Sequence, residues 1–143
     1  MRALQAAFYR GATRADLLQF AASRIRQAGS PYTGVYLYMM HDGATLELEA
    51  FDGRTTEHTR IPVGKGICGR AVAEARDLNV PDVTAAPGYL ACSLETRSEL
   101  VVLIRRNEEI LGQIDVDSDL VDPFTPAEER AVKAVADALA ALL

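Results

Sequence analysis

The residues of this sequence best suited to chemistry are its cysteines and a small group of acidic residues. Cys92 stands in the stretch PGYLACSLETRSE, residues 87–99, which has a proline-glycine turn and neither strand nor helix periodicity. A loop of about 13 residues in a compact domain is usually functional or disordered, and these residue types indicate an ordered loop. A thiol there, close to carboxylates, is a candidate nucleophile. The alternative for Cys92, and for Cys68, is a small, half-buried apolar residue.

Three acidic residues are expected to meet near that loop. Asp115 and Asp117 lie in IDVD, and residues two apart on a strand share one face. Aspartate is a poor strand former and adjacent carboxylates repel each other, so the pair has no evident structural purpose. Glu99 begins the neighbouring strand of the same expected hairpin, which brings the three acids to one end of the sheet. Crowding and partial burial predict that at least one of them has a raised pKa and keeps its proton near neutral pH.

Two other interpretations of these acids remain open. They suit a solvent-exposed outer face of the sheet, although Asp115 follows an apolar run that includes Leu111 and Ile114. They also offer oxygen ligands for iron or magnesium, but neither His41 nor His58 is placed to help, and two cysteines are too few for a cysteine-built zinc site. We therefore favour an acidic pocket beside a thiol, and expect no metal and no cofactor.

The hydrophobic pattern predicts the elements that position these residues. Apolar residues at helical spacing follow Thr13 and stop at Gly29, which indicates a capped amphipathic helix. Residues 32–41 and 45–51 are rich in aromatic and apolar residues and are joined by an Asp-Gly pair, a strong hairpin signal.

A glycine-rich segment follows this hairpin. Gly64, Gly66 and Gly69 match neither a P-loop nor a dinucleotide-binding fingerprint, so we interpret them as a tight turn that leads into a helix over 67–76. The next segment, LNVPDV, predicts a short edge strand, because Pro81 excludes a central position in a sheet.

The remaining segments complete an α+β fold. Residues 98–105 and 110–118 predict a second hairpin, and Thr125 with Glu128 forms a capping box for the last helix. This order of elements predicts a central antiparallel sheet flanked by N- and C-terminal helices. With neither repeat nor linker, residues 1–143 are expected to form a single domain.

Composition limits the possible partners and location. The net charge of −5 argues against nucleic acid or an anionic membrane as a partner, since neither attracts an acidic protein over long range. No apolar run approaches the roughly 20 residues that span a bilayer, and the N-terminus lacks a signal-peptide pattern. We expect a cytoplasmic protein.

Several motifs between residues 60 and 129 carry a resemblance to a known family. They are RIPVGKGICGRAVAE, VPDV, PGYLACS, SEL, ILGQIDVDS and DPFTPAEE. With GICG, ACS and IDVDS in register, the chain resembles a GAF domain, and more narrowly the free methionine-(R)-sulfoxide reductases, which are stand-alone GAF enzymes. Upstream of residue 60 only the helix and hairpin pattern agrees.

This resemblance implies roles for the residues singled out above. Cys92 matches the family's catalytic cysteine and Cys68 a resolving cysteine, while Glu99, Asp115 and Asp117 match acids that line the substrate pocket. The implied reaction is attack of a thiolate on the sulfoxide sulfur while a protonated acid gives its proton to the departing oxygen. The resulting sulfenic acid condenses with a second thiol, and a thioredoxin-like donor reduces the disulfide. Ionised acids would hold the ammonium group of the free amino acid. We also expect a homodimer.

Some positions depart from the family pattern. His58 stands where many members have a third cysteine, and Tyr89, Ser93 and Leu103 replace a common histidine, aspartate and proline. Resolution of the sulfenic acid then falls to Cys68 or to an external thiol. The alternative is a non-catalytic GAF domain that binds a small ligand as a sensor module, or one that senses a metal or nitric oxide through the acids.

Overall fold

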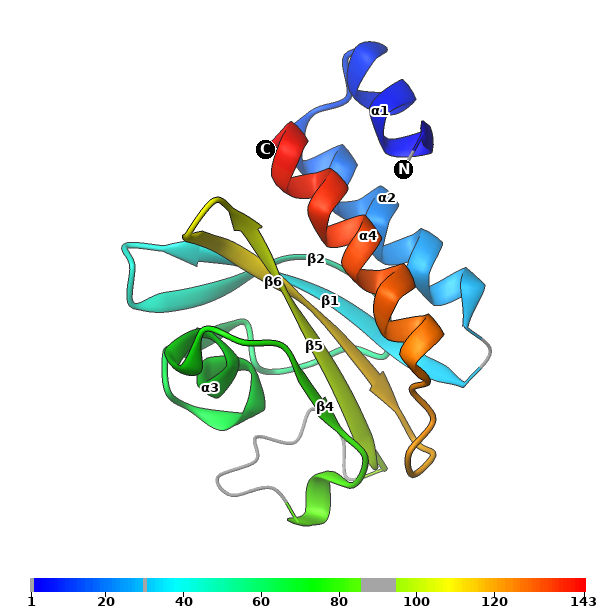
Figure 1. Ribbon diagram of the computed structural model, residues 1–143, viewed down its shortest axis with the longest axis vertical. Helices are drawn as coiled ribbons and strands as arrows, with labels where there is room; N and C mark the ends of the chain where they lie inside the picture. The colour runs from blue at the N-terminus through cyan, green and yellow to red at the C-terminus, as the bar shows by residue number, and fades with distance from the viewer. Residues whose placement is uncertain (1, 30, 86–94) are drawn as a thin grey trace.

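The computed structural model describes residues 2–29, 31–85 and 95–143 and shows the predicted α+β architecture (Figure 1). Its centre is a six-stranded antiparallel sheet in the order β3-β2-β1-β6-β5-β4. The strands are β1 (Tyr32–His41), β2 (Thr45–Gly53), β3 (Arg60–Pro62), β4 (Leu78–Val80), β5 (Ser98–Arg106) and β6 (Glu109–Ser118). The helices are α1 (Arg2–Tyr9), α2 (Arg14–Ala28), α3 (Gly66–Glu74) and α4 (Pro126–Leu142), with a 3-10 turn at Val83–Ala85.

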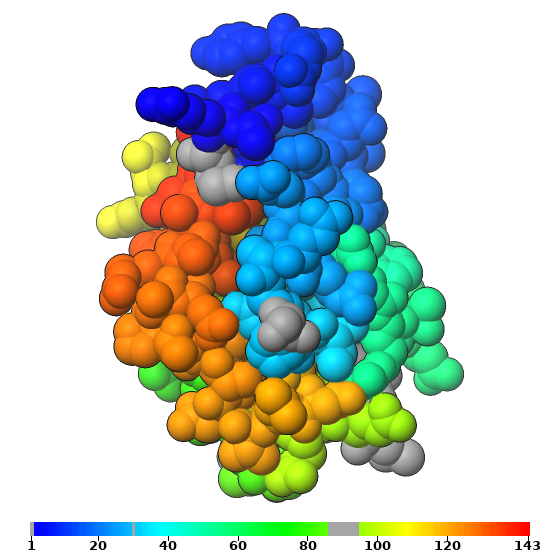
Figure 2. Space-filling view, turned by 90° about the vertical axis from the view of Figure 1, so that its right-hand side faces the viewer, coloured from blue at the N-terminus to red at the C-terminus, as the bar shows by residue number. Residues whose placement is uncertain are grey.

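Helices cover both faces of the sheet unequally. On one face α2 and α4 lie side by side, with α1 packed at their end, as Figure 2 shows for the outer surface of this layer. On the other face α3 packs against β3, β5 and β6 (Figure 1). Among the described residues, no helix combines the length and the apolar character that crossing a membrane requires.

Strand alternation divides the side chains of β5 and β6 between these two faces. Leu100, Val102 and Ile114 belong to the hydrophobic core under α2 and α4, whereas Val101 and Leu103 belong to the core under α3. All five are nearly inaccessible to solvent. Because successive residues of a strand point to opposite faces, the polar residues at the intervening positions of both strands are directed toward α3.

Both long helices begin with the caps that their sequences predict. In α2 the side chain of Thr13 accepts from Asp16 N at 3.1 Å, and Asp16 Oδ2 accepts from Thr13 N at 3.0 Å. In α4, Thr125 and Glu128 make the same reciprocal pair at 3.2 and 2.9 Å. Each capping box satisfies two N–H groups that have no partner within the helix.

The predicted hairpins, the edge strand and the order of the predicted helices are confirmed, but three elements were not predicted, the 3-10 turn at Val83–Ala85 and two others. Helix α1 precedes the first predicted helix, and the short strand β3 occupies part of the predicted glycine-rich turn. Strand β3 exists through its pairing with β2, in which Ile61 lies opposite Leu46. Its three residues are too short for a periodic signal, so tertiary pairing rather than local preference defines it.

Candidate functional site

A tight glycine turn holds Cys68 at the start of α3. Gly64 and Gly66 adopt φ angles of +93° and +63°, which side-chain-bearing residues rarely adopt. Gly69 lies so close to β3 that an added Cβ would meet the carbonyl oxygen of Pro62 at 2.5 Å. The glycines therefore bring α3 against the sheet, as predicted, and the helix directs Cys68 inward.

The three predicted acids converge on the face of the sheet that α3 covers. Glu99 of β5 lies opposite Asp117 of β6, and Asp115 lies two residues before Asp117 on the same strand. Their exposed fractions are 3%, 1% and 2% respectively. The interpretation of these residues as a solvent-exposed outer face is therefore wrong, and their predicted convergence is confirmed.

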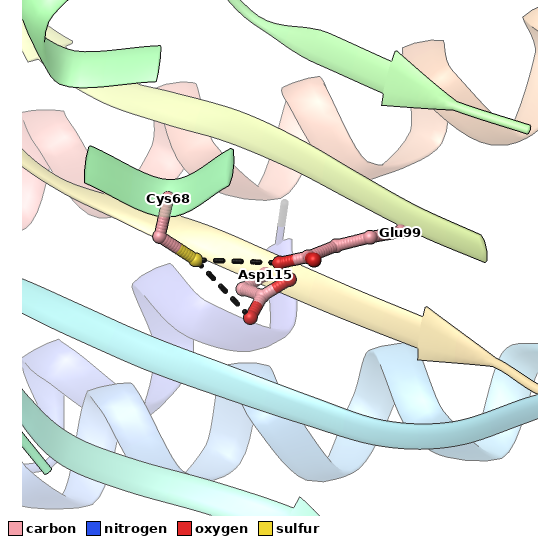
Figure 3. A group of neighbouring side chains, drawn as sticks. All are labelled: Cys68, Glu99 and Asp115. Carbon is pink, nitrogen blue, oxygen red and sulfur yellow. Dashed lines mark hydrogen bonds between the residues drawn. The ribbon is translucent and has the colours of Figure 1, made fainter. Parts of the chain in front are cut away.

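Cys68 contacts two of these acids directly. Its Sγ donates to Glu99 Oε2 and to Asp115 Oδ2, each at 3.3 Å, and Figure 3 shows the thiol pointing from α3 toward the carboxyl groups on β5 and β6. Gln113, on the same face of β6, donates from Nε2 to the carbonyl oxygen of Cys68 at 2.9 Å. The sequence analysis missed Gln113, although its position two residues before Asp115 places it on the acidic face.

Burial keeps the carboxyl groups partly protonated at neutral pH. Burial raises the pKa of Asp115 well above its ordinary value, and the charge of Glu99 and a hydrogen bond with Glu99 raise it further. The pKa of Glu99 is raised to about 7, first by burial and then by the charge of Asp117. The prediction that crowding and burial raise the pKa of at least one of the acids is confirmed for Glu99 and Asp115.

The same environment keeps Cys68 in its neutral thiol form. Burial raises its pKa well above the ordinary value of 9.0, and the charges of Asp115, Glu99 and Asp117 raise it further. A thiolate is the nucleophilic form of cysteine, so Cys68 in this position is a hydrogen-bond donor rather than an activated nucleophile.

A small cavity adjoins the thiol and the acids. Its volume is about 10 Å³, which is room for about one water molecule. Cys68, Glu99 and Asp115 line it together with His58 and Lys65. His58 therefore lines the same cavity as the acids, but it is not among the residues whose ligand atoms lie within 4.8 Å of one another.

His58 reaches the cavity because Tyr38 anchors its backbone. The hydroxyl of Tyr38 donates to the carbonyl oxygen of His58 at 2.7 Å, and Tyr38 itself lines the cavity. In the sequence, His58 was considered as a metal ligand and as the residue at the position of a missing cysteine, but it was not predicted to line the site. Nothing in the pattern near Tyr38 indicated that β1 supports the site, because the contact joins two separate elements.

Cys92 lies outside the described residues, so its predicted place near the acids stays a prediction. The described chain on either side of that segment is held together, since Val83 N donates to Arg97 O at 2.8 Å. Arg97 N in turn donates to Ser118 O at 2.9 Å, at the end of β6, the strand that carries the aspartates.

Comparison with known proteins identifies relatives of this fold and sequence. A family model described as the GAF domain matches residues 14–143. Protein YtsP of Bacillus subtilis is 35% identical over 108 residues, which are 76% of this chain and 65% of YtsP. The free methionine-R-sulfoxide reductase of Escherichia coli is 35% identical over 96 residues, 67% of this chain and 57% of that protein. The chain thus spans less than two thirds of the length of these two relatives.

A solved structure of similar size agrees over most of the chain. It is described as a type II free methionine-R-sulfoxide reductase from Thermoplasma acidophilum, with 36% sequence identity and a TM-score of 0.86. The superposition covers 90% of this chain and 91% of the other.

Proposed function

Since the chain belongs to the GAF domain family, we propose that it uses this fold to reduce free methionine-(R)-sulfoxide to methionine. The observation that carries the proposal is the buried cluster of Cys68, Glu99 and Asp115, in which a thiol and carboxyl groups of raised pKa lie within hydrogen-bonding distance. Sulfoxide reduction needs both a thiol and a proton source, and the similarity to two reductases supports this chemistry.

The first step requires a nucleophilic thiol and an acid. In the proposed reaction Cys92 loses its proton and its sulfur attacks the substrate, so that the sulfoxide sulfur is reduced and Cys92 is oxidised. The sulfur–oxygen bond of the sulfoxide breaks as oxygen transfers to Cys92, giving a sulfenic acid and methionine. Asp115 or Glu99 protonates the oxygen as it departs, and the proton released by the thiol restores the acid.

The second step uses Cys68 as the resolving thiol. Its sulfur attacks the sulfenic acid of Cys92, a disulfide forms, and water leaves with the thiol proton. Because Cys68 is a neutral, buried thiol, it does not compete with Cys92 for substrate in the first step. An external dithiol of the thioredoxin type then reduces the disulfide to two thiols and is itself oxidised.

The acidic character of the site also accounts for a free amino acid as substrate. Ionised carboxylates would pair with the substrate's ammonium group, which a peptide-bound methionine sulfoxide lacks. The present cavity of about 10 Å³ admits a water molecule and not an amino acid, so substrate binding requires the cavity to widen.

An epimer-resolved assay tests the proposal. The purified protein with dithiothreitol should reduce free methionine-(R)-sulfoxide and largely spare the S epimer and peptide-bound sulfoxide. Equal rates on all three substrates would contradict the predicted specificity. If none of the three substrates is reduced, the proposal that the protein is a methionine sulfoxide reductase is wrong.

Two cysteine variants test the roles separately. Cys92→Ser should abolish turnover with either reductant. Cys68→Ser should impair thioredoxin-driven turnover more than dithiothreitol-driven turnover, because a small thiol can replace the resolving cysteine. If both variants behave alike with both reductants, the assignment of roles is wrong.

The second candidate function is a non-catalytic GAF domain that binds a small ligand. The observation that favours it is His58, which occupies the position of a third cysteine in many reductases and lines the cavity. This function predicts saturable binding of methionine sulfoxide or a similar amino acid without any product, which the same assay distinguishes.

A further inference from the structure

The cluster on the α3 face brings together the donor types that bind transition metals. One ligand atom each from Cys68, Glu99 and Asp115 lies within 4.8 Å of the others, and all three residues are buried. Figure 3 shows the three side chains directed at a common point from α3, β5 and β6. We propose that this cluster binds one divalent ion of the zinc type.

The distances suit a tetrahedral ion. Zinc binds cysteine sulfur at about 2.3 Å and carboxylate oxygen at about 2.0 Å, so two such ligands of a tetrahedral ion lie about 3.5 Å apart. Cys68 Sγ lies 3.3 Å from both Glu99 Oε2 and Asp115 Oδ2. The side chains therefore need only small shifts to hold an ion in place of the protons that now lie between them.

A second observation points to a cation at this place. Asp115 Oδ1 is buried and finds no hydrogen-bond donor in the part of the chain that the structure describes. Its interaction partners include the carboxyl groups of Glu99 and Asp117, which offer acceptors. A buried carboxylate oxygen among other carboxylates needs a positive charge or a shared proton.

The cavity provides room for one ion or for one water molecule beside it. Its volume of about 10 Å³ is close to that of one water-sized sphere, and the three proposed ligands line it. His58 lines the same cavity but is not among the residues whose ligand atoms lie within 4.8 Å of one another, so a water molecule is the expected fourth ligand. Sulfur and carboxylate donors together favour zinc over magnesium or calcium, which prefer oxygen alone.

An ion at this site also has a consequence that depends on the proposed function. It displaces the thiol proton of Cys68 and the shared carboxyl proton to solvent. The proposed reductase reaction uses that carboxyl proton, so the metal-bound form is expected to be inactive and removal of the metal to restore it.

Cobalt titration tests the site without reference to activity. The metal-free protein, reduced with a phosphine rather than a thiol, is titrated with Co²⁺ while the thiolate-to-cobalt absorption is recorded. One equivalent should produce the band, Zn²⁺ should displace it, and Zn²⁺ should raise the thermal midpoint of the wild type. Cys68→Ser should lose the band, and Asp115→Asn should weaken binding by about tenfold or more.

His41→Ala is the matched control. His41 lies 3.3 and 3.1 Å from the carboxylates of Glu47 and Glu49 in an exposed histidine–carboxylate group, so its loss should leave the titration unchanged. Absence of the band from the wild type, or its survival in Cys68→Ser, overturns the proposal. If circular dichroism shows that Cys68→Ser does not fold, the Co²⁺ affinity of Asp115→Asn is the deciding measurement. A Co²⁺ affinity equal to that of the wild type overturns the proposed site.

Inhibition is measured separately. Reductase turnover that stops with one equivalent of Zn²⁺ and returns with a chelator supports the regulatory consequence. Full turnover of the zinc-saturated protein overturns that consequence alone. A protein without reductase activity that still shows the Cys68-dependent cobalt band contradicts the proposed function and leaves the metal site supported.

Discussion

On the α2 and α4 face, β5 and β6 present Leu100, Val102 and Ile114, all buried in hydrocarbon. On the α3 face the same two strands present Glu99 and Asp115, equally buried but among acceptors and a thiol. Burial of apolar groups stabilises the fold, whereas burial of carboxyl groups costs free energy. Apolar packing stabilises both faces, since Val101 and Leu103 are buried under α3, but the α3 face also holds an unfavourable cluster of buried carboxyl groups.

The largest expected effect is on activity, from Asp115→Asn. Loss of the carboxyl proton donor should lower the rate of methionine sulfoxide reduction by about 10²- to 10⁴-fold, the contribution typical of a general acid. The thermal midpoint should not fall, because the substitution removes a buried ionisable group. Asp137→Asn, on the exposed side of α4, is the matched control and should retain full activity. A collapsed midpoint for Asp115→Asn would instead give this residue a structural role.

The next effect is on stability, from Ile114→Ala on the opposite face of the same strand. Removal of this fully buried side chain should lower the free energy of unfolding by about 2–5 kcal/mol, measured by urea denaturation. Activity per folded molecule should persist. Ile110→Ala, at a half-buried position of β6, should cost less. Equal losses at both positions would contradict the division between the two faces.

A pH dependence of stability should come from the acidic face. The pKa of Glu99 is about 7 when folded, against an ordinary value of 4.5, so the folded state binds the proton more tightly. Proton binding by Glu99 therefore stabilises the folded state. This contribution to the free energy of unfolding is complete below pH 4.5 and is lost as the pH rises through 7. At about 1.4 kcal/mol per unit, the loss is of the order of 3 kcal/mol.

The ionisable groups that act on Glu99 are Cys68 on α3 and Asp115 and Asp117 on β6. Urea denaturation between pH 5 and 8 measures the slope, and Glu99→Gln should reduce it. If the free energy of unfolding of the wild type rises between pH 5 and 8, burial does not raise the pKa of Glu99.

The smallest expected effect comes from the cap of α4. Thr125→Ala removes the capping hydrogen bond and should lower the free energy of unfolding by about 1 kcal/mol without changing activity. Thr55→Ala, at an exposed position outside the helices and strands, is the control and should leave stability unchanged. A loss of activity at unchanged stability would connect α4 to the site and weaken the contrast between the faces.

Local patterns were sufficient to predict most of the fold. The capping residues Thr13 and Thr125 mark the starts of α2 and α4, and the Asp-Gly pair marks the turn between β1 and β2. The start of α3 was predicted to within a residue, but its end was not, because Ala75 adopts the left-handed conformation that a glycine would usually signal.

The candidate site was predictable only in part. Spacing alone placed Asp115 and Asp117 on one face, and hairpin register placed Glu99 beside them. The direct contacts of Cys68 with the acids span 31 and 47 residues of sequence, and neither strand nor helix periodicity encodes them. The place of His58 depends likewise on Tyr38, a residue of another strand.

By itself, then, the sequence determined where most of the helices and strands begin and which acids share a face. It also determined that Cys68 and Cys92 each lie in a motif that resembles the family pattern. These follow from backbone sterics, side-chain periods of 3.6 and 2 residues and local capping, which act over a few neighbours. Only the tertiary structure decided that α3 seals the acidic face, that Cys68 lies 3.3 Å from two carboxyl groups and that burial raises the pKa of Asp115. Those outcomes depend on desolvation by packing, and packing joins residues that the chain keeps far apart.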